Sequence, residues 1–296
     1  MANLKEVRNR IASVKSTRQI TSAMKMVSAS KLRKAQNAVL TMRPYAVKLQ
    51  EIMQNLSSSM EDSSESVFAK KREQKRVLLV VITSNRGLCG AFNVNVVKEA
   101  IHLLENELVT LHTRKNVDMM CLGKKGADLL KAKGFAVKEA QTEIFNELNF
   151  ENATVIAEKL MNDFEEGSYD RIVLIYNQFK NAAVQILNIE DFLPVTEDKS
   201  AEASQTKSIQ ADYIFEPGKE EILKELIPKT LKIQLYKALL DSFAAEHGAR
   251  MTAMHQATEN ATELIKNLNL SYNKARQAAI TKEILEIVSG AEALKG

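Results

Sequence analysis

The last third of the chain, residues 220–294, is a helix-forming segment whose centre reads MTAMHQATENATELIKNLNLSY over residues 251–272. It holds one proline, Pro228, and two glycines, Gly248 and Gly290, among strong helix formers. Apolar residues recur every three or four positions: Ile233, Tyr236, Leu240, Phe243, Met251, Met254, Ala257, Ala261, Ile265, Leu268, Tyr272, Ala275 and Ala279. At about 1.5 Å per residue such a helix spans roughly 100 Å. That is too long for one compact domain, so the helix needs a partner.

The partner is predicted at the other end of the chain, where residues 3–56 contain one proline, Pro44, and no glycine. Steps of three and four residues trace a second seam: Leu4, Val7, Ile11, Val14, Arg18, Thr21, Lys25, Ser28, Leu32, Ala35, Val39, Met42, Ala46, Leu49, Met53 and Leu56. The seam is apolar at its ends and polar from Arg18 to Ser28, so we expect its middle to be loose, wet or turned toward another protein. Helices at opposite ends of a chain pair most simply as an antiparallel coiled coil, with the rest as a globular insert.

Between these helices the pattern predicts a Rossmann-like α/β domain. We expect strands at residues 77–83, 117–122, 135–138, 171–176 and 182–189, alternating with helices at 95–111, 124–133 and 153–164. This order favours a mostly parallel sheet with crossover helices. The expected fold class is thus α/β plus a long antiparallel coiled coil. We divide the chain into an N-terminal helix (1–57), a Ser-rich linker (58–76), the α/β domain (77–192), a returning loop (193–219) and a C-terminal helix (220–296), with Pro228 kinking that helix or marking its start.

Charge is concentrated near the N-terminus. Residues 1–50 hold eleven Lys and Arg against one acid, a net charge of +10, whereas the remaining chain carries −6 of the total of +4. So basic a helix favours an acidic surface, which nucleic acid, an anionic membrane or an acidic protein would each supply. The sequence has no run of 18 apolar residues, and we expect no signal peptide because no apolar segment follows the first charges. Its two cysteines predict a reducing compartment without a disulfide framework.

One turn, residues 84–90 (SNRGLCG), follows the first predicted strand, where α/β folds bind phosphates. It matches neither a P-loop nor a dinucleotide fingerprint, so we interpret its glycines as structural. Cys89 has no histidine nearby in the sequence and is expected to be a packed thiol. His247 and His255 lack a third metal ligand and are expected to face solvent or a partner.

Three stretches carry a resemblance to a known family: IASVKSTRQITSAMKMVSASKLRKAQ (11–36), SNRGLCGAFN (84–93), and EHGARMTAM (246–254) with YNKARQAAITKEI (272–284). They resemble the gamma subunits of bacterial-type F1Fo ATP synthases, in the same order and over nearly the whole chain. The resemblance implies a central rotor stalk that couples proton flow through a membrane ring to ATP synthesis or hydrolysis. It implies alpha, beta and epsilon subunits and a membrane c-ring as partners, with no nucleic acid. It also implies a peripheral position on the cytoplasmic face of the bacterial inner membrane and no catalytic residue, cofactor or metal of its own.

The resemblance also implies which residues make contacts. Those expected against the catalytic ring are Arg8, Arg10, Met24, Lys25, Arg250, Gln277 and Thr281. Those expected at the foot, near the membrane ring or the epsilon subunit, are Arg33, Lys34, Tyr213 and Glu216. Two alternatives stay open: a nucleotide-dependent α/β enzyme with helical arms, and a basic coiled-coil nucleic-acid-binding protein. The first needs a phosphate loop and an acid for the ribose, and the second lacks aromatic stacking residues apart from Tyr45.

Overall fold

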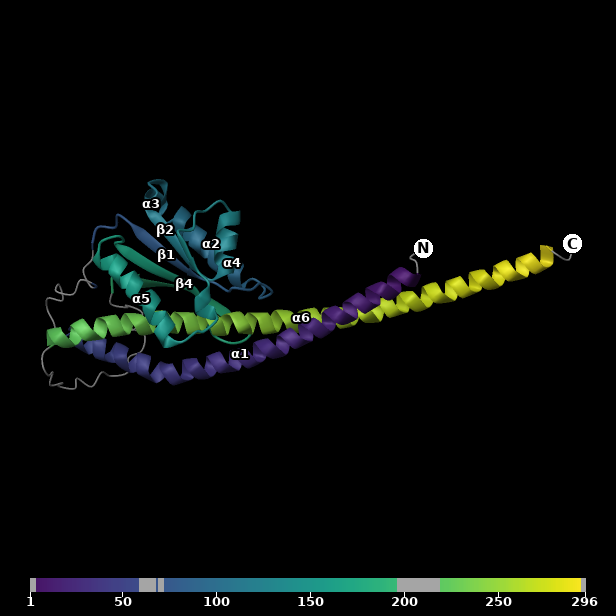
Figure 1. The fold of residues 1–296 in the computed structure, drawn as a ribbon, viewed down its shortest axis with the longest axis horizontal. Helices are drawn as coiled ribbons and strands as arrows, with labels where there is room; N and C mark the ends of the chain where they lie inside the picture. The colour runs from purple at the N-terminus through teal and green to yellow at the C-terminus, as the bar shows by residue number, and fades with distance from the viewer. Residues whose placement is uncertain (1–3, 59–67, 69–71, 196–218, 294–296) are drawn as a thin grey trace. The chain divides into compact units, whose positions relative to one another are not determined.

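The computed structural model describes residues 4–58, 68, 72–195 and 219–293 (Figure 1). Two helices dominate the chain: α1 (Leu4–Ser58) and α6 (Lys219–Ala293). The chain divides into two compact units, Met1–Ala29 with Arg250–Gly296, and Ser30–Ala249, and both long helices contribute to each unit. The predicted class, an α/β domain with long terminal helices, is confirmed.

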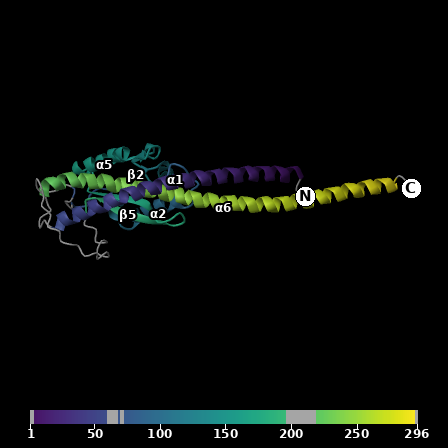
Figure 2. The same cartoon turned by 90° about the horizontal axis from the view of Figure 1, so that it is seen from below.

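In the first unit, α1 and α6 pair as an antiparallel coiled coil (Figure 2). Each seam position predicted between residues 4 and 28, and between 251 and 279, is buried or half-buried, as the helical period requires. The expectation of a loose, wet middle is wrong at two positions: Thr21 is 8% exposed and Ser28 only 2%. Thr21 bonds across the seam to Thr258, with 2.8 Å between the hydroxyl oxygens.

The second unit is built on a five-stranded sheet with strand order β3-β2-β1-β4-β5. The strands are β1 (Val77–Ile82), β2 (Val117–Leu122), β3 (Glu139–Gln141), β4 (Arg171–Phe179) and β5 (Gln185–Leu193). The neighbours β1–β2, β1–β4 and β2–β3 are parallel, and β4–β5 is an antiparallel hairpin. The predicted, mostly parallel sheet is therefore confirmed.

Helices cover both faces of this sheet (Figure 1). Val77, Leu79 and Val81 face a core shared with α2 (Phe92–Glu105), α3 (Val109–Thr113) and α4 (Lys124–Ala132). The alternate residues of β1 face α5 (Phe150–Glu165) and the first part of α6. Because both faces of β1 are buried, its sequence is a continuous apolar run.

Several predicted boundaries were wrong. The third strand was expected at 135–138, but β3 is Glu139–Gln141, and Phe135 and Val137 pack against the core between the sheet and α2–α4 instead. The helix expected at 95–111 is two helices, α2 and α3. The strand expected at 182–189 begins at Gln185, because Asn181 caps the preceding turn by accepting hydrogen bonds from the backbone of residues 183 and 184. Pro228 lies inside α6, so it does not mark the start of that helix.

Candidate functional site

Hydrogen bonds between side chains fix the register of the coiled coil. Arg8 Nη2 donates to Tyr272 Oη at 2.9 Å, Thr21 Oγ1 lies 2.8 Å from Thr258 Oγ1, and Lys25 Nζ lies 3.1 Å from His255 Nδ1. The residue numbers in each pair add up to 279 or 280, which is the signature of antiparallel helices in one constant register. The same register places Leu4, the first described residue of α1, opposite residues 275–276 of α6.

The polar centre of the coiled coil is an ordered hydroxyl pair. Thr258 Oγ1 also donates to the carbonyl oxygen of Met254 at 2.7 Å, and Thr21 Oγ1 lies 3.1 Å from the carbonyl oxygen of Arg18. A hollow of about 400 Å³ lies beside this pair, lined mainly by small and polar side chains. The centre is therefore well hydrogen-bonded within the pair, and its outer surface is polar.

His255 contacts a charged side chain on each helix. Besides its contact with Lys25, its Nε2 lies 3.4 Å from Glu259 Oε1. A neutral imidazole protonated at Nε2 satisfies both contacts, since Nδ1 then accepts from Lys25 while Nε2 donates to Glu259. The exposed His255 agrees with the expectation of a solvated histidine. That expectation is wrong for His247, which is buried with its ring edge-on to Phe243 at 4.5 Å between centroids.

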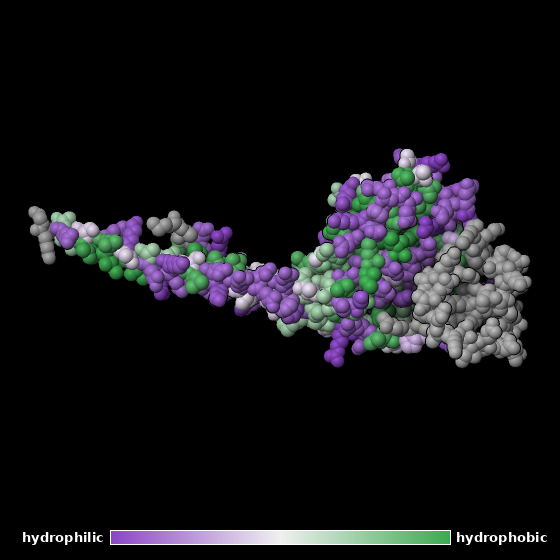
Figure 3. All heavy atoms as spheres, turned by 180° about the vertical axis from the view of Figure 1, so that it is seen from behind, coloured by the Kyte–Doolittle hydropathy of each residue, from purple (hydrophilic) through white to green (hydrophobic). Residues whose placement is uncertain are grey.

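The end of α6 runs past the start of α1 (Figure 2). Residues 280–293 are all exposed, and they include five large apolar side chains that are 48–71% exposed: Ile280, Ile284, Leu285, Ile287 and Val288. At about 100° per residue these five span an arc of about 160° on one side of the helix. Figure 3 shows apolar side chains, in green, on this end of the chain. Such a bare apolar face is typical of a surface that another protein covers.

The sequence seam stops at Ala279, so these five residues were missed. The register between the two predicted helices could have identified them. Aligning the two seams antiparallel leaves no residue of α1 to cover α6 beyond about its position 279, and the apolar residues that follow must then serve another contact.

The predicted contact residues are distributed over both units. Arg8, Arg10, Met24, Lys25, Arg250, Gln277 and Thr281 belong to the coiled-coil unit, whereas Arg33 and Lys34 belong to the unit with the sheet. Arg10, Arg33, Lys34, Gln277 and Thr281 are exposed, and Met24 and Lys25 are half-buried. Arg250 is only 6% exposed and makes polar interactions. Tyr213 and Glu216 lie outside the described residues.

Arg8 is held on the surface of the coiled coil by Tyr272. Its guanidinium lies 5.8 Å from the centre of the Tyr272 ring and donates to the phenol oxygen. This hydrogen bond lowers the pKa of the Tyr272 hydroxyl and raises that of Arg8. Arg8 is therefore a positioned charge, a pairing that sequence reasoning did not identify.

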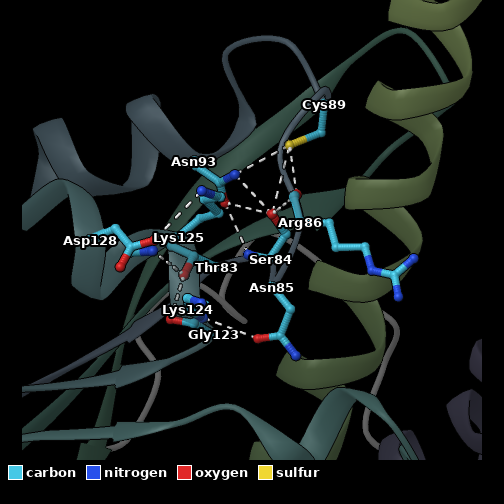
Figure 4. A network of polar contacts seen from close by, with 11 residues as sticks. Thr83, Ser84, Asn85, Arg86, Cys89, Asn93, Gly123, Lys124, Lys125 and Asp128 are labelled. Atoms are coloured by element: carbon cyan, nitrogen blue, oxygen red, sulfur yellow. Dashed lines mark hydrogen bonds and ion pairs between the residues drawn. The ribbon is translucent and has the colours of Figure 1, made fainter.

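The residues after β1 accept hydrogen bonds from backbone N–H groups of the kind that bind phosphate (Figure 4). At the start of α4, the backbone N–H of Lys124 donates to Asn85 Oδ1 at 3.0 Å and that of Lys125 to the carbonyl oxygen of Ser84 at 3.0 Å. The next N–H, of Gly126, donates to Thr83 Oγ1 at 2.9 Å. Free N–H groups at a helix N-terminus are what bind phosphate in α/β folds. At α4, the helix that follows β2, oxygens of residues 83–85 already occupy them.

Gly123 and Gly126 make this arrangement possible. A Cβ on Gly123 would lie 2.2 Å from the carbonyl oxygen of Thr83, and one on Gly126 would lie 2.6 Å from Thr83 Oγ1. Gly123 also has a φ of +117°, which other residues rarely adopt. These glycines serve close packing between β1 and α4. In the 84–90 turn itself, Gly90 has a φ of +60°, as a tight turn requires, but a Cβ on Gly87 or Gly90 would meet no heavy atom within 4 Å, so close packing is not their role.

The crevice between β1 and β4, where doubly wound sheets bind ligands, is filled by protein. Cys89, Phe92 and Ala245 form a buried cluster there, with Phe179 packed against it. Asn177 Nδ2, on β4, donates to the carbonyl oxygen of Phe92 at 3.0 Å. The candidate nucleotide site is therefore a packed core.

Both cysteines are buried. Cys89 Sγ lies 3.2 Å from Asn93 Nδ2, which confirms the expectation of a packed thiol. Burial raises the pKa of Cys121 to about 12. Among the described residues, no group of three or more His, Cys, Asp or Glu side chains is placed to hold a metal ion. In the same part of the chain, no helix has the length and apolar character needed to cross a membrane.

Comparisons with known proteins agree with this architecture. A family model described as ATP synthase matches residues 3–294. Proteins named ATP synthase gamma chain from Flavobacterium psychrophilum and Flavobacterium johnsoniae are each 60% identical to this chain over 296 residues, with both chains fully covered. Among solved structures, the central stalk and c-ring of Tetrahymena thermophila mitochondrial ATP synthase matches with 29% identity and a TM-score of 0.60, over 80% of this chain and 99% of that one. The rotor of Euglena gracilis mitochondrial ATP synthase shares the fold, with 22% identity and a TM-score of 0.65, over 94% of this chain and 98% of that one. The chain belongs to the ATP synthase gamma-chain family.

Proposed function

We propose that this chain is the rotating central stalk of an F-type ATP synthase and has no catalytic residue of its own. Its coiled coil turns inside a ring of alpha and beta subunits and presents a different side to each catalytic subunit in turn. A side that contacts the open and closed forms of a subunit unequally shifts that subunit between them. The observation that carries the proposal is the coiled coil whose α6 continues as a bare, one-sided apolar helix in a chain of this family.

Basic residues of α1 are the proposed contacts with acidic segments of the ring. Arg8, Arg10 and Lys25 supply positive charge and Met24 an adaptable apolar contact. Exposed ion pairs contribute about 0–1 kcal/mol each. Contacts that weak favour a turning shaft, because no single angle binds strongly enough to stop rotation.

The second proposed contact is the bare end of α6, with Gln277 and Thr281 at its beginning. Its apolar arc covers about half of the helix circumference, and the opposite side carries charged residues such as Lys282 and Glu286, an ion pair at 3.5 Å. A ring that surrounds this segment contacts an apolar surface on one side and a charged surface on the other. Arg250, about 40 Å back along the same helix, is proposed as a separate contact with the ring.

The foot of the stalk is proposed to involve Arg33 and Lys34, with Tyr213 and Glu216, in contact with the epsilon subunit and a membrane c-ring. The solved relatives are titled as a central stalk with a c-ring and as a rotor, which supports these partners. The matched gamma chains from Flavobacterium support a bacterial complex, attached peripherally to the cytoplasmic face of the inner membrane. We propose that the chain uses neither cofactor nor metal and binds no nucleic acid.

A nucleotide-dependent α/β enzyme is the alternative that the geometry argues against most directly. The N–H groups of α4 are already bonded to the β1 turn, and the crevice beside β4 is packed. Isothermal titration of the isolated chain with ATP or NAD tests this, and micromolar binding would favour the enzyme. DNA binding that survives competition by alpha and beta subunits would favour the nucleic-acid-binding alternative over the proposed function.

The direct test is to purify the tagged chain from its native membranes and identify the proteins that co-elute. Alpha, beta, epsilon and c subunits are expected, and their absence would refute the proposal. In vesicles carrying the complex, Met24→Lys should lower the number of protons pumped per ATP hydrolysed. Gln74→Lys is the matched control, since it adds the same charge at an exposed position outside the coiled coil. If both variants pump like the parent, Met24 is not a contact with the ring.

A further inference from the structure

The first part of α6 runs along one face of the sheet (Figure 1). It packs there through an apolar stripe. Its residues are Ile227, Leu231, Leu235, Ala238 and Leu239, all buried against β1, β4 and α5. Apolar packing has no direction of its own. The stripe alone therefore opposes separation of α6 from the sheet more than it opposes rolling of the helix about its own axis.

On one flank of the stripe, Gln234 bonds to the edge strand β5. Its Nε2 donates to Glu190 Oε1 at 2.7 Å and contacts the carbonyl oxygen of Asp191 at 3.3 Å. Glu190 Oε2 accepts from the hydroxyl of Tyr176 at 2.8 Å, and that hydroxyl accepts from Asn188 Nδ2 at 2.9 Å. Tyr176 is fully buried, and burial together with the Glu190 charge raises its pKa, so the hydroxyl remains a donor. Both carboxylate oxygens of Glu190 are thus bonded, one to the helix and one to the sheet.

On the other flank, α6 is tied to α5. Lys232 Nζ bonds to Glu158 Oε1 at 2.6 Å. One turn further, the Tyr236 ring packs edge-on against Phe150 with 5.6 Å between ring centres. These contacts come from a different element than those of Gln234.

The helical period puts the two ties on opposite sides of the stripe. Taking Leu235 as the centre, Gln234 lies about 100° to one side, and Lys232 and Tyr236 lie about 60° and 100° to the other. Hydrogen bonds weaken steeply when their angle changes. Rolling α6 in either direction therefore stretches one tie while compressing the other.

We propose that Gln234, through Glu190, and Lys232, through Glu158, are positioning residues that lock α6 against rolling on the sheet, so that torque passes between the sheet and the long helix. This inference rests on the proposed rotary function, but the lock itself belongs to the isolated chain. It assigns these four side chains a mechanical role, separate from the contacts of the stalk with its partners.

The test exchanges the amide at position 234 and the carboxylate at position 190 in the full-length chain. Gln234→Glu places a second carboxylate beside Glu190 and should break the tie. Adding Glu190→Gln restores one donor facing one carboxylate, and the replacement amide oxygen still accepts from Tyr176. Lys229→Ala is the matched control, because Lys229 lies on the same helix but, among the residues that the structure describes, pairs only with the exposed Glu225 at 3.4 Å.

The first measurement is the distance distribution between spin labels on α6 and on the sheet, attached at the exposed positions 224 and 180. Gln234→Glu should raise the displaced population about tenfold or more, the ratio expected from losing one charge-assisted hydrogen bond. The swapped pair should lower it again toward the parent distribution, short of full recovery because the contact of the position-234 amide with the Asp191 carbonyl oxygen at 3.3 Å is not restored, and Lys229→Ala should leave it unchanged. A parent-like distribution in Gln234→Glu would overturn the lock. If that variant does not fold, Gln234→Ala combined with Lys232→Ala answers the same question.

The second measurement is protons pumped per ATP in the assembled complex. We expect this ratio to fall in Gln234→Glu and to recover in the swapped pair, whereas a purely structural role would lower thermal stability and leave the ratio intact. Displacement of α6 with a parent-like ratio would overturn the torque role. Failure of the parent chain itself to support pumping would count against the proposed function, while the distance measurement would still decide the lock.

Discussion

Replacing Thr21 by valine, Thr258 by valine, and then both should reveal how much the buried hydroxyl pair couples the two helices. Two hydroxyl protons serve three contacts: Thr258 to the carbonyl oxygen of Met254 at 2.7 Å, Thr21 to that of Arg18 at 3.1 Å, and the pair itself at 2.8 Å. The shortest set has Thr258 donating to its own helix and Thr21 donating to Thr258. This assignment decides what each variant loses.

Each single variant should lose one neutral hydrogen bond, about 0.5–1.5 kcal/mol, because the remaining hydroxyl can still bond a carbonyl of its own helix. The double variant should be nearly neutral, since two valines of similar shape leave no unmatched polar group. The expected coupling between the two positions equals the sum of the two single losses, about 1–3 kcal/mol, with the opposite sign.

The assay is native-state hydrogen exchange of peptides from residues 11–29 and 250–268, which reports opening of the coiled coil apart from the unit that holds the sheet. Protection should fall in each single variant and recover in the double variant. If the double variant loses as much protection as the two single variants together, the hydroxyls do not act as a pair and the reasoning fails.

Two further predictions concern the unit with the sheet. Gly123→Ala should destabilise it by at least about 2 kcal/mol, because the new Cβ adds strain at positive φ and overlaps Thr83. Gly134 has a φ of +85° and no heavy atom within 4 Å of a Cβ, so Gly134→Ala should cost only about 1 kcal/mol. Equal urea midpoints for the two variants would contradict the steric argument. Cys89 and Cys121 should both resist alkylation at about pH 8 in the native chain and react after denaturation, because both are buried. The thiolate is the reactive form, and burial holds the pKa of Cys121 at about 12, far above the assay pH. Rapid labelling of either cysteine in the native chain would refute the packing described.

The two long helices and their seams could be predicted from sequence because helical periodicity is local. A position three or four residues from a buried one shares its face whatever the rest of the chain does. The burial of Val7, Ala261 and Ile265 followed directly. What periodicity could not supply was the polar centre, since Thr21 and Ser28 are buried only through a partner that lies more than two hundred residues away.

Errors in the α/β unit also have identifiable causes. The strand β3 is short, polar and at the edge of the sheet, so it lacks the apolar run that identified β1. Phe135 and Val137 drew the prediction to the wrong segment because a core-facing loop and a strand are alike in composition. Burial of His247 depends on residues from distant elements, which a local pattern does not contain.

The candidate contacts were the least accessible to sequence reasoning. Charge imbalance indicated the basic helix, and the family resemblance supplied particular residues. The Arg8–Tyr272 pair and the Gln234–Glu190 tie each join residues from separate elements. They became visible only once the helices and the sheet were placed together.

The unequal lengths of the paired helices make the chain tolerant of shortening from one direction only. Trimming α6 back to about residue 280 removes no residue that faces α1, so the pair should stay folded although its exposed tip is gone. Trimming a similar length from the beginning of α1 uncovers Ile265, Leu268 and Tyr272, and the newly wetted seam should fray and aggregate.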